Sequence, residues 1–163
     1  MANNLLRLCL LIGMLTTFGC TQSKPYDAIA THPVTGTVHI NGVPAQGALV
    51  RFWPQTVQPG VKYPISPVGK VDASGTYQLT SYEGPDGAPL GEYVVTITWP
   101  DPDWRPPGGG MPPPPPDRLL GKFGDSKKPV LKFTVVDGQN NVDPIVLDNA
   151  KILEGSKLPS ASN

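Results

Sequence analysis

The sequence is poor in the side chains that most metal sites and nucleophilic sites use. It holds two histidines, His32 and His39, and two cysteines, Cys9 and Cys20. No Cys/His or His/His spacing fits a zinc site, and no Gly-x-Ser-x-Gly motif marks a nucleophilic serine. We therefore expect no metal, no cofactor and no catalytic residue, and we predict that the protein is not an enzyme.

Net charge and long helices are also lacking. Thirteen basic residues balance thirteen acidic ones, which removes the usual electrostatic basis for binding nucleic acid or an anionic membrane surface. We predict no nucleic-acid partner. The chain also contains 21 prolines and 18 glycines, and because both residues destabilise helix interiors, long helices are hard to place.

The N-terminus has the pattern of a secretory signal. Arg7 is followed by an apolar run, Leu8 to Leu15, and then by Gly19 and Cys20. A charged start, a short apolar core and a small residue at the cleavage site are typical of a signal peptide. The run is shorter than the roughly 20 residues of a permanent membrane helix. We assign residues 1–19 to this signal peptide.

Removal of the signal peptide would leave Cys20 as the only cysteine, without a partner for a disulfide. It is then either a plain free cysteine or a modified one, and we favour modification because a free exported thiol is prone to oxidation. Gly19-Cys20 resembles the lipobox of bacterial lipoproteins, whose cysteine receives a diacylglycerol and fatty acids such as palmitate. This resemblance implies lipidation at Cys20 and a location in the cell envelope, membrane-anchored and facing the periplasm or the cell surface. The polar residues 20–32 are predicted to be a tether.

From residue 33 onward, short segments of alternating polarity are separated by turn signals, as in β-sandwiches. Val34 to Ile40 alternates and is followed by Asn41-Gly42, a strong hairpin signal. Further segments are expected at 48–53, 68–71, 76–80, 91–99, 129–136 and around 145–147. We predict an all-β fold, a single and mostly antiparallel β-sandwich of about seven strands over residues 33–149. Residues 150–163 are predicted to be a disordered tail.

The strongest strand of the pattern is 91–99. Its two faces hold different sets, Tyr93, Val95, Ile97 and Trp99 on one and Val94, Thr96 and Thr98 on the other. Residues 100–118 follow and include five consecutive prolines. Proline has no backbone donor for a sheet, so we predict a protruding loop, part flexible and part polyproline II.

Several motifs occur in a characteristic order, Val34-Thr35-Gly36-Thr37-Val38, Asn41-Gly42-Val43-Pro44, Val71-Asp72-Ala73-Ser74-Gly75-Thr76-Tyr77 and Gly91-Glu92-Tyr93-Val94-Val95. This order resembles the carboxypeptidase regulatory-like domains, which implies a transthyretin-like sandwich. The stretches Leu119 to Phe123 and Leu131 to Val135, with Gly138-Gln139-Asn140, are similar to small lipoproteins of planctomycete bacteria. The resemblance implies a fold and a location but no defined activity.

Four aromatic residues are candidates for ligand binding, Trp53, Trp104, Tyr63 and Tyr82. We expect Trp53 on the outward face of its strand and the other three in loops. Exposed rings can stack on sugars or peptides, or they can pack against the long loops. The proline run is either a ligand for an aromatic groove or a stiff spacer.

We predict a non-enzymatic, lipid-anchored envelope module, structural or binding a protein or polymer. The alternative is an accessory carbohydrate- or peptide-binding lipoprotein that uses the exposed aromatics. The expected partners are the membrane, through the N-terminal lipid, and an envelope protein or polysaccharide. The sequence leaves the oligomeric state open.

Overall fold

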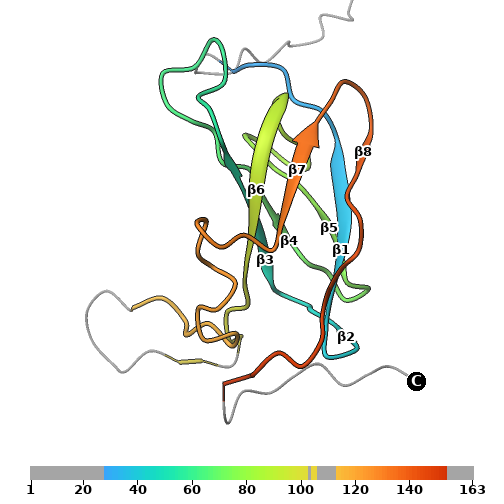
Figure 1. Cartoon of the computed structure of the whole chain (residues 1–163), viewed down its shortest axis with the longest axis vertical. Helices are drawn as coiled ribbons and strands as arrows, with labels where there is room; N and C mark the ends of the chain where they lie inside the picture. Colours follow the sequence, from blue (N-terminus) through green and yellow to red (C-terminus); the bar gives the residue numbers. More distant parts are fainter. Residues whose placement is uncertain (1–27, 103, 106–112, 154–163) are drawn as a thin grey trace, which may run out of the picture.

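A computed structural model describes residues 28–102, 104–105 and 113–153, which form two packed β-sheets (Figure 1). The strands are β1 (Val34–Ile40), β2 (Val43–Pro44), β3 (Leu49–Pro54), β4 (Val68–Lys70), β5 (Thr76–Gln78), β6 (Gly91–Thr98), β7 (Leu131–Val135), β8 (Asn140–Asn141) and β9 (Ile145–Leu147). Within these ranges there is no helix, so the all-β prediction is confirmed. No helix long and apolar enough to cross a bilayer occurs in them either.

The first sheet is built around β1. This strand pairs antiparallel with β2 and β5 and parallel with β8 and β9. The second sheet has the order β4-β3-β6-β7 and is antiparallel throughout. Mostly antiparallel pairing was expected. The parallel pairs were not, because they join the two ends of the domain and no local turn signals them.

The core lies between the sheets and follows the predicted alternation. Val34, Val38 and Ile40 of β1 are buried, and so are Val50 and Phe52 of β3. The Phe52 ring lies 5.8 Å from the Tyr93 ring and 6.0 Å from the Phe133 ring, measured between centroids. Full burial of one such side chain stabilises a fold by roughly 1.5–3 kcal/mol.

The inward position of Gly36 makes room for an aromatic ring. A Cβ atom built on Gly36 would lie 2.5 Å from the Tyr77 hydroxyl oxygen. That hydroxyl is buried and has no hydrogen-bond partner in the described part of the chain, and burial raises the pKa of Tyr77. Glycine is therefore required at position 36 for steric reasons.

The domain extends beyond the predicted boundary at residue 149. The Asn41 side chain donates to the Ala150 carbonyl at 2.9 Å and accepts from the Ala150 N–H at 2.8 Å. The Leu153 N–H donates to the Arg118 carbonyl at 2.8 Å. Residues 150–153 are therefore attached to the sandwich, and the remaining tail, 154–163, lies outside the described residues.

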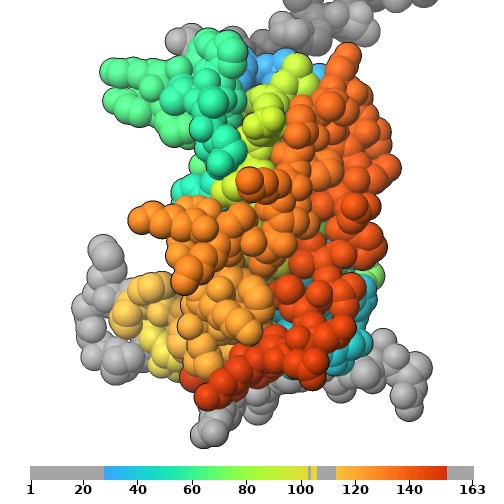
Figure 2. Space-filling model, in the orientation of Figure 1, coloured from blue at the N-terminus to red at the C-terminus, as the bar shows by residue number. Residues whose placement is uncertain are grey.

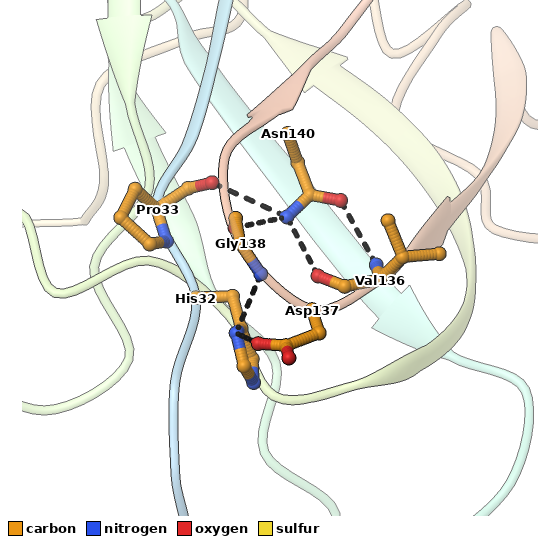
Figure 3. A network of polar contacts seen from close by, with 6 residues as sticks. All are labelled: His32, Pro33, Val136, Asp137, Gly138 and Asn140. Carbon is orange, nitrogen blue, oxygen red and sulfur yellow. Dashed lines mark hydrogen bonds and ion pairs between the residues drawn. The ribbon is translucent and has the colours of Figure 1, made fainter.

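The last part of the predicted tether is also attached. His32 forms an isolated bridge with Ala88, and its Nδ1 lies 3.2 Å from the Gly138 N–H nitrogen and 3.2 Å from an Asp137 carboxylate oxygen (Figure 3). The Ile29 N–H donates to the Tyr82 hydroxyl at 3.1 Å. Residues 28–32 thus lie on the domain, while residues 20–27, with Cys20, lie outside the described part.

Asn140 joins this N-terminal segment to the turn after β7. Its side-chain nitrogen donates to the carbonyls of Val136 and Gly138 at 2.9 Å and of Pro33 at 3.4 Å, and its oxygen accepts from the Val136 N–H at 2.9 Å (Figure 3). The residue is only 3% exposed. One amide therefore bonds to four backbone groups, of which the Pro33 carbonyl also accepts the Asn140 backbone N–H at 2.9 Å.

We predict that Asn140→Ala lowers the free energy of unfolding by about 2–3 kcal/mol, because buried backbone groups lose their partners. Asn141→Ala is the matched control, since the Asn141 side chain accepts one exposed hydrogen bond from Thr35, and it should change stability by less than about 0.5 kcal/mol. Urea unfolding of both variants measures the difference. Equal midpoints would contradict the role given to Asn140.

Candidate functional site

The most distinctive surface feature is the indole of Trp53. Register places Trp53 opposite Val94 of β6 and on the side of the β4-β3-β6-β7 sheet that points away from the core, here called the outer face. The Trp53 Nε1–H donates to the Thr96 hydroxyl at 2.9 Å, so the ring reaches across to β6. The side chain nevertheless remains 37% exposed. The indole is therefore fixed in orientation while much of it faces solvent.

The indole has a cationic neighbour on its own strand. The Arg51 guanidinium carbon lies 5.4 Å from the centre of the Trp53 ring, within the range of a cation–π contact. Lys132 of β7 pairs with Val94, so it lies on the same row as Trp53, about 10 Å away across two strand spacings. The indole thus has one cation in contact with its ring and a second cation on its row.

The outer side of β6 is buried rather than exposed. Val94 is 5% exposed and Thr96 is 3% exposed, although both lie opposite the core-facing set. We predicted Val94 and Thr96 on this second face, and the structure has them there. Their burial could not be predicted, because the groups that cover them come from other segments of the chain. The covering group that the contacts identify is the indole, through its bond to Thr96.

A hollow of about 360 Å³ opens on the same face beside this row. Its polar side chains come from three segments, Gln55 after β3, Glu92 of β6, and Lys132 and Thr134 of β7. They offer an amide, a carboxylate, an ammonium group and a hydroxyl within one depression. Such a set can both donate and accept hydrogen bonds.

Two loops border this side of the molecule. Figure 2 shows the surface hollowed between the loop of residues 55–67, in teal and green, and the segment of residues 119–130, in orange, called the arm below. The first loop is held by Gln58, which exchanges two hydrogen bonds with the Ile65 backbone and donates to the Tyr93 hydroxyl at 3.2 Å. Burial raises the pKa of Tyr93, whose hydroxyl donates onward to the Pro89 carbonyl.

The arm is anchored at its base and along β6. The Asp117 carboxylate accepts from the N–H groups of Trp99, Leu119 and Gly121 at 2.7–3.0 Å. Farther along, the Ile97 N–H donates to the Phe123 carbonyl and the Val130 N–H donates to the Val95 carbonyl, both at 2.9 Å. The arm and the loop thus have fixed positions on either side of the hollowed surface in Figure 2.

A buried arginine strengthens the base of the arm. Arg118 is 2% exposed, its guanidinium lies 5.0 Å from the Trp99 ring, and its Nη2 lies 3.5 Å from an Asp101 carboxylate oxygen. The Trp99 indole in turn donates to the Gln46 carbonyl at 2.9 Å. This group is enclosed by the protein and contributes to the arm's position, not to the exposed surface.

The other three aromatic candidates lie outside the strands of the β4-β3-β6-β7 sheet. Tyr63 is 71% exposed in loop 55–67, and the Lys62 ammonium lies 5.3 Å from its ring. Tyr82 is half-buried and accepts the Ile29 N–H. Trp104 is half-buried in a segment at the opposite end of the sandwich from loop 55–67 (Figure 1).

The resemblance to carboxypeptidase regulatory-like lipoproteins stays a prediction after comparison of the chain with known families and proteins. No model of a known protein family matches the chain, and no curated protein matches it. Within residues 28–102, 104–105 and 113–153, no group of three or more His, Cys, Asp or Glu side chains is arranged to hold a metal ion. The candidate site therefore depends on the geometry around Trp53.

Sequence reasoning selected Trp53 but missed the residues that define its surroundings. Thr96 was predicted on the correct face without a role, and Gln55, Glu92 and Lys132 were not selected. Gln58 was passed over as a loop residue. Nothing in the sequence links Thr96 to Trp53. Only the register of β3 with β6 brings the Thr96 hydroxyl to the indole.

We predict that Thr96→Val frees the indole from its fixed orientation and lowers the free energy of unfolding by about 1 kcal/mol, because the Nε1–H loses its acceptor. Iodide quenching of tryptophan fluorescence should increase. Thr98→Val, on the same face of the same strand, has no such bond and serves as the control. Identical quenching in both variants would contradict a locked indole.

Proposed function

We propose that this protein is a non-catalytic, lipid-anchored module of the cell envelope that binds polysaccharide on its outer face. The observation that carries the proposal is the Trp53 indole, held by Thr96 on a sheet surface and still open to solvent. The proposal includes the carboxypeptidase regulatory-like assignment, which the motif order and the two-sheet sandwich support.

A fixed, exposed indole suits a sugar ring. The face of an aromatic ring is electron-rich, and the C–H bonds on the flat side of a sugar are weakly positive and apolar. A ring that is already oriented loses little side-chain entropy on binding. The hydrogen bond to Thr96 therefore holds the ring in an orientation that a ligand can use. Coverage of the sheet alone would not require a fixed orientation.

The polar hollow beside the ring supplies the second half of such a site. Sugar hydroxyls need both donors and acceptors, and Gln55, Glu92 and Thr134 provide them next to the row of Trp53 and Lys132. Recognition on a rigid sheet, with pinned loops on either side, suits a repeating polymer that lies along the surface.

We predict that Trp53→Ala lowers affinity for isolated envelope polysaccharide at least ten-fold, a loss of about 1.4 kcal/mol. The stacking platform is lost, while the core residues beneath the sheet are unchanged. Trp104→Ala is the matched control and should retain binding. Co-sedimentation with the insoluble polymer measures both, and thermal melting checks the fold. Retained binding by Trp53→Ala would contradict this site.

The anchoring part of the proposal rests on Gly19-Cys20 after an apolar run. We predict that Cys20→Ser moves the protein from the membrane fraction to the soluble fraction of cells, because the thiol that would accept the lipid is absent. Cys9→Ser lies inside the predicted signal peptide and should leave fractionation unchanged. Membrane association of Cys20→Ser would argue against lipidation.

A further inference from the structure

The outer face and the two loops that border it carry an excess of positive charge. The cationic residues are Arg51, Lys70 and Lys132 on the outer face, Lys62 in loop 55–67, and Lys122, Lys127 and Lys128 on the arm. The same elements carry two acidic residues, Glu92 and Asp125. The whole chain has no net formal charge, so this excess is a local feature of one side.

Among the described residues, none of these cations forms an ion pair with a carboxylate. The ion pairs in the described ranges are His32 with Asp137 and Arg118 with Asp101, and neither involves a cation of this side. Arg51 contacts the Trp53 ring, and Lys122 lies 5.2 Å from the Phe123 ring. Cation–π contacts orient a positive group without cancelling its charge.

Two of these cations, Arg51 and Lys132, lie around the Trp53 indole. Arg51 contacts the indole, and Lys132 lies on the far side of Val94 on the same row as the indole. A sugar stacked on Trp53 would therefore have a cation on either side. The arm adds further lysines beyond the indole's hydrogen-bond partner, since Gly124 lies against Thr98 of the outer face.

We propose that the polymer bound at this face is an acidic polysaccharide, with carboxylates on its sugars paired by Arg51 and Lys132. This inference rests on the proposed function and adds the charge of the ligand. A sugar polymer fits better than an acidic peptide because the fixed, solvent-facing indole lies between the cations, where a sugar ring can stack while its carboxylate reaches either side.

Two probes with the same backbone test the charge directly. One is an oligomer of galacturonic acid, and the other is the same oligomer with every carboxylate methyl-esterified. The full chain, purified in mild detergent, should bind the acid at least ten-fold more tightly than the ester at about 20 mM salt. The preference should shrink several-fold at about 500 mM salt, where the screening length falls to a few ångströms.

Substitutions separate charge from stacking. Arg51→Gln and Lys132→Gln should each weaken binding of the acid about two- to five-fold, the range of exposed charge pairs, and weaken binding of the uncharged ester by a smaller factor. Arg51→Lys keeps the charge and should retain most of the affinity. Lys151→Gln removes an exposed lysine outside these elements and is the control, with no expected effect.

The outcomes distinguish the two proposals. Equal binding of acid and ester, abolished by Trp53→Ala, would overturn the acidic preference and leave polysaccharide binding standing. Binding of polyglutamate as tight as that of the galacturonate oligomer would also overturn it, because charge alone would then suffice. Failure of both oligomers and of isolated envelope polysaccharide to bind would overturn the proposed function itself.

Discussion

The structure depends on the central position of β1 in its sheet. This strand pairs with β2, β5, β8 and β9, so the first and last parts of the domain lie in one hydrogen-bonded layer. Backbone groups of a buried central strand must be paired, since each orphan costs about 1–3 kcal/mol. The parallel pairing with β8 and β9 satisfies the side of β1 that β2 and β5 leave open, and Asn140 extends that pairing to Pro33.

The second sheet packs one face against the core and presents the other as the outer face. Phe52, Tyr93 and Val95 fill the interior, which leaves Arg51 and Trp53 on the opposite face, where Trp53 is bonded to the buried Thr96. Strand geometry fixes the face on which these side chains lie. A site on such a face is as stable as the sheet that carries it. Loop 55–67 and the arm border this site on two sides.

Period-two patterning predicted the larger part of the fold. The alternation in Val34 to Ile40 and Tyr93 to Trp99 identified the strands and their inner faces, because burial on one face imposes that rhythm. The parallel contacts of β1 could not be predicted, since no local signal links residues so distant in the sequence. The same holds for the bond between Trp53 and Thr96, which exists through the register of two strands, and for the arm, whose position follows from Asp117 accepting three backbone N–H groups.

The attachment of residues 28–33 has a mechanical consequence. The chain reaches the domain at β1, in the first sheet, whereas the aromatic platform lies on the second. A pull on the N-terminal segment would enter the domain at β1. Because β1 pairs with β5 over Thr35–Thr37 and with β9 over Val38–Ile40, a pull directed along β1 would load both ladders at the same time.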